Sequence, residues 1–164
     1  MNIKVAIITV SDRSSRGERA DLSGPEIKKW AESHAYSVTA ETVVPDELEA
    51  IKNELVRLSD AGTDLVVTTG GTGFAPRDVT PEATRAVIER EAPGFAEAMR
   101  FNSLKITPHA MLSRAVSGIR KKTLIINLPG SPKAVRENLA FIEKAIPHAV
   151  DLLNSQVTDC GSSS

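Results

Sequence analysis

The sequence contains little cysteine, few aromatic residues and no long apolar run, and each shortage excludes a class of protein. Cys160 is the only cysteine, so no internal disulfide can form and no thiolate zinc site can be built. Aromatic residues make up 4% of the chain, too few for a platform that stacks single-stranded bases and few for an all-β sandwich. No stretch approaches the ~20 apolar residues that a membrane helix needs. We therefore expect a protein of the reducing cytoplasm with no membrane partner.

The chain also lacks an excess of charge of either sign. Its 20 Lys and Arg residues balance 21 Asp and Glu residues, for a net charge of −1. This balance argues against a nucleic-acid partner, because proteins that bind nucleic acid normally present a basic surface. The 164 residues, of which 41% are hydrophobic, suit one folded domain. We place this domain at residues 1–154 and expect residues 155–164, which include Cys160, to form a flexible tail.

Short apolar segments alternate along the chain with segments of helical periodicity. The first, residues 1–10, is β-branched and is not followed by a small-residue cleavage site, so it predicts a strand and not a signal peptide. We expect strands over 3–10, 37–44 and 64–69, a hairpin over 115–128, and helices over 23–35, from 45, over 81–105 with a break at 93–94, from 132 and over 147–154. Continuously apolar strands between helices indicate a sheet covered on both faces. The predicted fold is a three-layer α/β/α domain with a mostly parallel sheet and one antiparallel element.

Three polar residues stand where helix N-caps are expected. Ser23 precedes Glu26 by three residues, which is the spacing of a capping box, and Thr80 stands before a proline. Asp46 follows a proline at the start of a predicted helix. Helix capping is therefore one sufficient explanation of the Asp46 carboxylate.

Polar and glycine-rich segments directly follow the predicted strands. In open α/β sheets, ligands bind outside the carboxyl ends of the strands. The segments found there are Ser11-Asp12-Arg13, Pro45-Asp46, Gly70-Gly71-Thr72-Gly73 with Arg77-Asp78 shortly after it, and Pro129-Gly130-Ser131-Pro132-Lys133. We expect three carboxylates, two glycine turns and two basic side chains to meet at one edge of the sheet.

Each of these parts suits the binding of phosphate. Glycines leave backbone N–H groups uncrowded by Cβ atoms, and Gly130-Ser131 at a helix start offers the positive end of that helix to an anion. Arg77 and Lys133 can neutralise phosphate oxygens. Asp46 and Asp78 supply the oxygen ligands that Mg²⁺ prefers when it is bound jointly with phosphates. The residues predict a site for a nucleotide or another phosphorylated small molecule, with nucleotidyl or phosphoryl transfer as its chemistry.

Structural explanations of the same residues stand beside the functional one. Asp78 could do no more than hold a loop turn, and a glycine turn after a strand serves chain reversal about as often as binding. The turn Gly70–Gly73 is neither a Walker phosphate loop nor a dinucleotide fingerprint, because the required lysine and glycine spacings are absent. The three histidines are far apart in the sequence, and we assign them no catalytic role.

Several segments also follow one another in a characteristic order. They are Thr9-Val10-Ser11-Asp12-Arg13, Asp21-Leu22-Ser23-Gly24, Thr68-Thr69-Gly70-Gly71-Thr72-Gly73, Ala75-Pro76-Arg77-Asp78-Val79-Thr80-Pro81, Pro93-Gly94-Phe95 and Leu128-Pro129-Gly130-Ser131-Pro132-Lys133. In this order they resemble the molybdopterin adenylyltransferase family of molybdenum-cofactor synthesis, whose domain also occurs as the G domain of gephyrin. The resemblance covers nearly the whole chain, and the run from Thr68 to Thr84 is its most specific part.

The resemblance implies a reaction, an assembly and two essential residues. Family members transfer AMP from Mg-ATP to the terminal phosphate of molybdopterin and release pyrophosphate. The product passes to a second enzyme, which inserts molybdate. The family fold is a three-layer α/β/α domain, usually assembled as a homotrimer. The two essential aspartates of the family correspond here to Asp46 and Asp78, which are therefore the expected catalytic residues and Mg²⁺ ligands.

We divide the remaining residues between the two substrates. Ser11, Asp12 and the turn Gly70–Gly73 are expected to hold the nucleotide, whereas Ser131, Lys133 and the backbone of Pro129 and Gly130 are expected to hold the pterin or its phosphate. The phosphate of molybdopterin is itself the nucleophile. Its second pKa lies at about 6, so it is anionic near neutral pH and needs no strong general base.

Three other functions are weighed against this one. A paralogue could bind molybdopterin without transferring AMP, although the chain keeps both the Pro45-Asp46 pair and the Pro76–Pro81 run. A nucleotide pyrophosphatase of the same fold, as in the competence/damage-inducible family, usually has a longer chain with further domains. A flavin-binding electron carrier is disfavoured because few aromatic residues are present to sandwich the ring.

Overall fold

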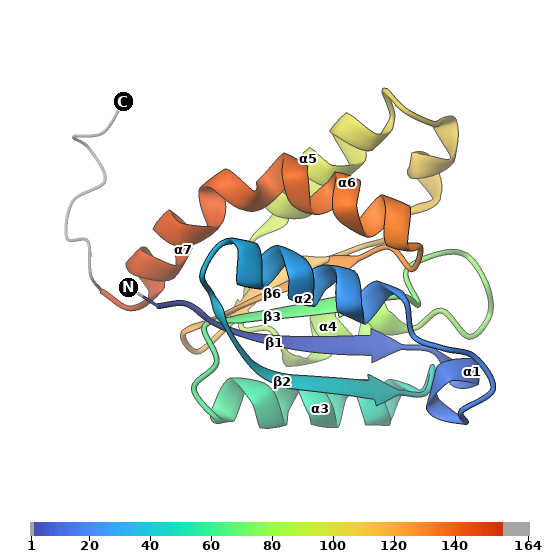
Figure 1. Cartoon of the computed structure of the whole chain (residues 1–164), viewed down its shortest axis with the longest axis horizontal. Helices are drawn as coiled ribbons and strands as arrows, with labels where there is room; N and C mark the ends of the chain where they lie inside the picture. The colour runs from blue at the N-terminus through green and yellow to red at the C-terminus, as the bar shows by residue number, and fades with distance from the viewer. Residues whose placement is uncertain (1, 156–164) are drawn as a thin grey trace.

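Six strands form one sheet in a computed structural model of the protein, which describes residues 2–155 (Figure 1). The strands are β1 (Lys4–Val10), β2 (Ser37–Val44), β3 (Leu65–Thr69), β4 (Arg90–Glu91), β5 (Ser117–Arg120) and β6 (Thr123–Leu128), and their order in the sheet is β2-β1-β3-β6-β5-β4. β1, β2, β3 and β6 pair in parallel, whereas β5 is antiparallel to both of its neighbours. The predicted mostly parallel sheet with one antiparallel element is confirmed.

Helices cover both faces of the sheet (Figure 1). One face carries α2 (Ser23–Ser33), α5 (Pro93–Ser103), α6 (Pro132–Ile142) and α7 (Ile146–Leu153), and the other carries α3 (Leu48–Asp60) and α4 (Thr80–Val87). Alternate residues of β1 explain the two layers: Val5 and Ile7 belong to the first core, and Ala6 and Ile8 to the second. The predicted three-layer arrangement is confirmed. Within residues 2–155, no helix combines the length and the apolar character needed to cross a membrane.

The sequence does not predict the shortest elements. These are α1 (Asp12–Ser15), the strand β4, and the 3-10 helices η1 (Pro108–Leu112) and η2 (Glu143–Ala145). Each has two to five residues, too few for a hydrophobic period to appear. The tail expected over 155–164 and its Cys160 lie, apart from Ser155, outside the described residues.

The capping roles expected for Ser23 and Thr80 are wrong. Asp21 precedes α2, and its Oδ1 accepts a hydrogen bond from the backbone N–H of Ser23 at 3.2 Å. The hydroxyl of Ser23 instead donates to the carbonyl of Gly130 at 2.5 Å. Thr80 is the first residue of α4, and its Oγ1 donates to the carbonyl of Gly70 at 2.9 Å. Both hydroxyls therefore fasten a helix start to one of the two glycine turns.

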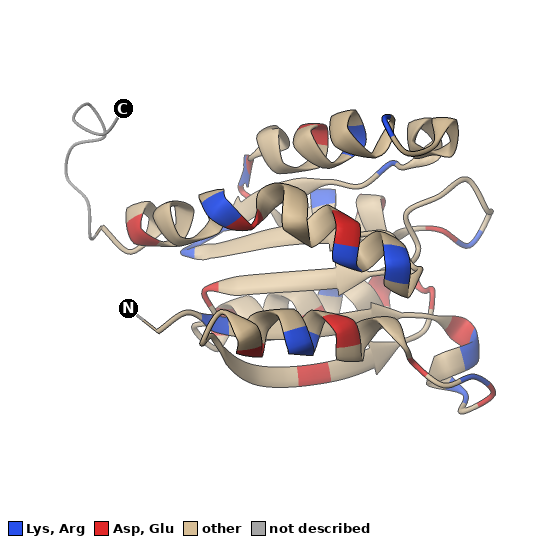
Figure 2. Cartoon of the chain, turned by 45° about the horizontal axis from the view of Figure 1, so that its top comes forward, with Lys and Arg blue, Asp and Glu red and all other residues tan. Residues whose placement is uncertain are grey.

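Charged residues of both signs are interspersed over the coloured part of the chain in Figure 2. On α3, Lys52 pairs with Glu49 at 3.3 Å and Arg57 with Glu54 at 2.6 Å, each three residues apart. Such exposed helix pairs contribute little to stability, but they keep the surface mixed in charge.

Asn127 joins three parts of the fold by buried hydrogen bonds. Its Oδ1 accepts from the N–H of Val116 at 3.0 Å, and its Nδ2 donates to the hydroxyls of Thr68 and Thr84, also at 3.0 Å. All three hydrogen bonds are buried, so loss of the amide leaves polar groups that no water reaches.

We expect Asn127→Leu to lower the free energy of unfolding by about 2–4 kcal/mol, because it leaves a buried N–H and two hydroxyls without their partner. Thr68→Val is the matched control, since it removes one of the three bonds and should cost about 1 kcal/mol. Urea unfolding measures both values. An Asn127→Leu protein as stable as the wild type would contradict a stabilising role for this network.

Candidate active site

The carboxyl ends of the four parallel strands lie at one edge of the sheet. The segments that follow them are Ser11-Asp12 after β1, Pro45-Asp46 after β2, Gly70–Gly73 after β3 and Pro129–Ser131 after β6. Hydrogen bonds connect neighbouring ends: Ser11 N–H donates to the carbonyl of Val44 at 2.9 Å, and Thr69 Oγ1 donates to that of Pro129 at 2.7 Å. The structure therefore brings together the segments expected to form the site.

Gly70 and Gly71 form the sharpest part of the turn after β3. Their φ angles are +99° and +68°, which a residue with a side chain rarely adopts. A methyl group on Gly70 would collide with the carbonyl oxygen of Val10. One on Gly71 would collide with Thr80 Oγ1 and would lie 3.1 Å from Asp46 Oδ1. Only glycines allow the turn to lie this close to the ends of β1 and β2.

The four carbonyl oxygens of Gly70–Gly73 all accept hydrogen bonds from outside the turn. The first two accept from Thr80, through its Oγ1 at 2.9 Å and its N–H at 3.1 Å. The last two accept from Arg114, through its backbone N–H and its Nε, both at 2.8 Å. By contrast, the last three N–H groups of the turn have no acceptor among residues 2–155. Successive N–H groups left free in a turn form a concave site for an anion.

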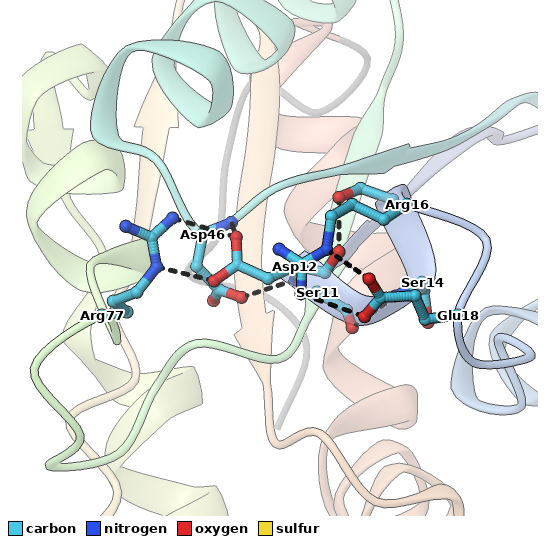
Figure 3. Close-up of polar contacts among 8 residues, drawn as sticks. Ser11, Asp12, Ser14, Arg16, Glu18, Asp46 and Arg77 are labelled. Atoms are coloured by element: carbon cyan, nitrogen blue, oxygen red, sulfur yellow. Dashed lines mark hydrogen bonds and ion pairs between the residues drawn. The ribbon is translucent and has the colours of Figure 1, made fainter.

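Asp12 and Asp46 hold each other by reciprocal hydrogen bonds (Figure 3). The N–H of Asp12 donates to Asp46 Oδ2 at 2.9 Å, and the N–H of Asp46 donates to Asp12 Oδ1 at 3.0 Å. The capping role considered for Asp46 is wrong, because α3 begins after Glu47 and no side chain caps it. Asp46 is instead fixed to the end of β1, beside the glycine turn.

Arg77 pairs with Asp12 through both carboxylate oxygens (Figure 3). Its Nε lies 2.6 Å from Oδ2 and its Nη2 lies 2.9 Å from Oδ1. The hydrogen bond from Arg77 lowers the pKa of Asp12 below its ordinary value, and the backbone N–H of Asp46 adds to the effect. Arg77, which is expected to neutralise phosphate oxygens, and Asp12, which is expected to hold the nucleotide, therefore bind each other here, although the Arg77 side chain is 59% exposed.

Asp46 has the opposite shift. Burial raises its pKa above the ordinary value, and the negative charges of Asp12 and Asp78 raise it further, while the N–H of Asp12 opposes them. The ionised carboxylate is therefore in an unfavourable environment when no cation is present. A cation bound to Asp46 would remove this penalty.

Asp78 has the structural role considered for it, and it also faces the glycine turn. Its Oδ2 accepts from the N–H of Ala75 at 3.0 Å, which closes a short turn. The same oxygen would lie 3.0 Å from a methyl group placed on Gly73. Asp46 and Asp78 thus approach the turn at different glycines, Gly71 and Gly73.

These two carboxylates fit Mg²⁺ only as part of a larger ligand set. Among residues 2–155 there is no group of three or more His, Cys, Asp or Glu side chains arranged to hold a metal. Mg²⁺ requires six oxygen ligands and usually keeps waters and substrate phosphates among them. Asp46 and Asp78 can therefore supply part of the set, with the rest from phosphate and water.

Two cavities flank the glycine turn. The first, about 260 Å³, is lined by Ser11, Ser14, Asp21, Gly70, Gly130 and Ser131 among others. The second, about 280 Å³, is lined by Thr72, Gly73, Met99, His109, Ser113 and Glu137 among others. Ser11 and Ser131, which the sequence analysis assigns to different substrates, line the same cavity. The second cavity contains none of the expected residues except Thr72, Gly73 and Pro129.

Ser11, Ser131 and Lys133 make further contacts of their own. The hydroxyls of Ser11 and Ser131 accept from backbone N–H groups and cap α1 and α6. Lys133 lines neither of these two cavities; its ammonium lies 3.8 Å from Glu137, and its side chain is 77% exposed. Sequence reasoning missed Arg114, and no motif marks it, because its side-chain contacts are 32 to 41 residues distant.

We expect Asp46→Asn to raise the melting temperature of the ligand-free protein at pH 7. Below the ordinary Asp pKa of 3.8 the carboxyl is neutral in the folded and unfolded states, so no penalty exists. As the pH rises above that value, the unfolded state ionises more readily than the native state, and the native protein is destabilised. The gain from Asp46→Asn should therefore shrink in acid.

Asp12→Asn is the matched control, because the pKa of Asp12 is shifted down and its loss should lower the melting temperature at pH 7. Thermal melts between pH 3.5 and pH 7.5 measure both effects. An Asp46→Asn protein that melts below the wild type at pH 7 would contradict the assigned environment of this carboxylate.

Comparisons with known proteins agree with this fold and with the expected family. Residues 6–148 match the family described as "Probable molybdopterin binding domain". The chain is 47% identical over 154 residues to the molybdopterin adenylyltransferase of Helicobacter pylori (strain J99), covering 92% of this chain and 88% of that protein. It is 49% identical over 162 residues to the gephyrin of Dictyostelium discoideum, covering 93% of this chain but 23% of that longer protein.

A solved structure is also similar. The molybdopterin biosynthesis enzyme MoaB from Thermus thermophilus is 49% identical, with a TM-score of 0.89 over 93% of this chain and 97% of that one. The expected family is therefore confirmed both by sequence and by fold. This chain belongs to the molybdopterin-binding-domain family that the molybdopterin adenylyltransferases represent.

Proposed function

We propose that the protein transfers AMP from Mg-ATP to the terminal phosphate of molybdopterin and releases pyrophosphate. One observation carries this proposal: the N–H groups of Gly71, Thr72 and Gly73 have no acceptor within residues 2–155, and the carboxylates of Asp46 and Asp78 approach the same turn. A site that places N–H donors for phosphate oxygens next to two carboxylate ligands for a hard cation suits transfer at a phosphorus atom. The name that several relatives bear, molybdopterin adenylyltransferase, supports molybdopterin as the acceptor and an adenylyl group as the group transferred.

The reaction requires little covalent chemistry from the protein. An oxygen of the molybdopterin phosphate forms a bond to the α-phosphorus of ATP. The bond from that phosphorus to the bridging oxygen breaks, and pyrophosphate leaves with the electron pair. No proton has to be removed from the nucleophile, because a phosphate monoester is largely dianionic near neutral pH. The site accordingly needs positioning groups more than a general base.

The roles of the chain's own residues follow from their places. Asp46 and Asp78 would hold Mg²⁺, which when bound neutralises negative charge on the phosphates. The N–H groups of Gly71 to Gly73 would bind phosphate oxygens. Arg77 can exchange its pairing with Asp12 for a phosphate, because its guanidinium is exposed and joined to the loop before Asp78.

The two cavities suit the two substrates. We assign the nucleotide to the first cavity, which contains the N-terminal end of α6 and the hydroxyls of Ser11 and Ser14. We assign the pterin to the second, where Met99 gives an apolar wall and the Glu137 carboxylate can accept from ring N–H groups. Under this assignment Ser131, which was expected to hold the pterin or its phosphate, lines the nucleotide cavity instead.

Three further parts of the proposal derive from the family resemblance. We propose a homotrimer, hand-over of the product to a molybdate-inserting enzyme, and a cytoplasmic location. Exposed apolar side chains on and after α5, among them Phe101, Leu104, Ile106 and Met111, support self-association, because monomers rarely keep such groups in water together.

We expect Asp46→Asn and Asp78→Asn each to lower the rate of AMP transfer by about 100-fold or more, since each removes a ligand of the phosphate-bound cation. The measurement is pyrophosphate release and formation of adenylyl-molybdopterin. Asp60→Asn, at the far end of α3, is the control and should keep the wild-type rate.

Several outcomes would overturn the proposal. A folded Asp46 or Asp78 variant with a near-normal rate would exclude that residue as a metal ligand of consequence. Molybdopterin binding without pyrophosphate release would indicate a binding paralogue. Hydrolysis of ADP-ribose or nicotinamide mononucleotide would indicate the pyrophosphatase.

The cavity assignment has its own test. We expect Ser14→Leu, which fills the first cavity, to raise the KM for Mg-ATP about tenfold and to leave the KM for molybdopterin unchanged. Ala110→Leu, in the second cavity, should do the reverse. The opposite pattern would exchange the two substrates between the cavities.

A further inference from the structure

Arg114 lies beside the site but belongs to none of the motifs that define it. It stands between η1 and β5, and its neighbours Ser113 and Ala115 both line the second cavity. The carbonyl oxygens of these neighbours accept hydrogen bonds from Arg100 Nη1 on α5, at 3.3 and 2.8 Å. The backbone around Arg114 is therefore anchored to α5.

The guanidinium of Arg114 reaches from this anchored backbone to the loop that carries Asp78. Its Nε donates to the carbonyl of Gly73 at 2.8 Å, and its Nη2 donates to that of Asp78 at 2.7 Å. Its Nη1 pairs with Glu82 on α4, 2.5 Å from Oε1. All three nitrogens are thus engaged, and a planar guanidinium can meet three such partners in one orientation only.

These contacts join the two ends of the loop 73–78. Inside the loop, the N–H of Asp78 donates to the carbonyl of Ala75 at 2.9 Å, and the N–H of Ala75 donates back to the Asp78 carboxylate at 3.0 Å. Because Arg114 holds the carbonyls of Gly73 and Asp78, neither peptide can rotate without losing a charge-assisted hydrogen bond. The Gly73 end and the Asp78 end of the loop are therefore kept in place together. The peptide that carries the N–H of Gly73 is held by the backbone N–H of Arg114, which donates to the carbonyl of Thr72 at 2.8 Å.

We propose that Arg114 is the positioning residue of the phosphate site. It acts through Gly73 and Asp78 and does not touch the substrate. Its side chain holds the Gly73 carbonyl away from the ligand, and it keeps Asp78 at a fixed distance from the turn. The identity of the ligand rests on the proposed function, whereas the holding of the loop does not.

Lysine at this position separates positioning from charge. An ammonium group keeps the positive charge beside the phosphate site, but it is a point donor and lacks the fork that spans two carbonyls and a carboxylate. Arg120→Lys is the matched control. Arg120, on β5, also donates to a backbone carbonyl, that of Val87 at 3.0 Å, and its side chain is 22% exposed, but its partner is the last residue of α4, at the end away from Asp78.

The experiment compares Arg114→Lys and Arg120→Lys in three measurements. Calorimetry gives the affinity for Mg-ATP, amide hydrogen exchange reports on residues 71–78, and kinetics give kcat/KM for AMP transfer. We expect Arg114→Lys to weaken Mg-ATP binding about tenfold, the effect of one lost charge-assisted hydrogen bond, and to speed exchange in the loop. The rate constant kcat/KM should fall by at least as much. Arg120→Lys should change none of the three, even if it lowers the melting temperature.

The remaining outcomes decide between a positioning role for Arg114, a purely structural role, and a failure of the proposed function. Unchanged affinity and unchanged loop exchange in Arg114→Lys overturn the proposal, whatever the wild-type activity. Losses in both variants that follow their melting temperatures also overturn it, because they indicate a purely structural role. Should Arg114→Lys not fold, Glu82→Gln loosens the same guanidinium and should weaken Mg-ATP binding by about threefold. A wild type that transfers no AMP overturns the proposed function, while loop exchange still decides the role of Arg114.

Discussion

The close approach of the Gly70–Gly73 turn to the ends of β1 and β2 is the constraint on which the rest of the site depends. Positive φ angles at two successive glycines bring the turn against Val10 and Asp46, where a side chain would collide. The partners of the turn then divide its polar groups. Thr80 and Arg114 donate to the carbonyls, and the N–H groups of Gly71, Thr72 and Gly73, which have no acceptor within residues 2–155, are left for an anion. A local backbone conformation is in this way converted into a binding surface.

The electrostatics of the site are consistent with a ligand that brings both a cation and phosphates. Asp12 has its charge balanced by Arg77, whereas Asp46 is partly buried beside two other carboxylates, and its pKa is raised. An ionised group in such a place reduces stability and persists in proteins mainly where function requires it. A balanced net charge of −1 is no obstacle, because backbone N–H groups and a shared cation bind phosphate without a basic surface.

The sequence was sufficient for five of the six strands, all but β4, and for most of the helices. Strands such as β1 and β6 are buried on both faces, so their apolar runs are continuous and easily recognised. The capping roles predicted for Ser23, Asp46 and Thr80 are wrong, because each residue bonds to another segment instead of to its own helix. The sequence could not predict these partners. The Asp12–Arg77 pair joins residues 65 positions apart, and the side-chain contacts of Arg114 span 32 to 41 positions. Such contacts exist only once the strand ends are assembled, and no local pattern records them.

A crystal structure with Mg²⁺ and a non-hydrolysable ATP analogue tests the central claim most directly. The predicted result is phosphate density on the N–H groups of Gly71 to Gly73, with a metal ion held between the phosphates and the carboxylates of Asp46 and Asp78. A nucleotide bound with its phosphates away from this turn, or with a metal ion that neither carboxylate contacts, would contradict it.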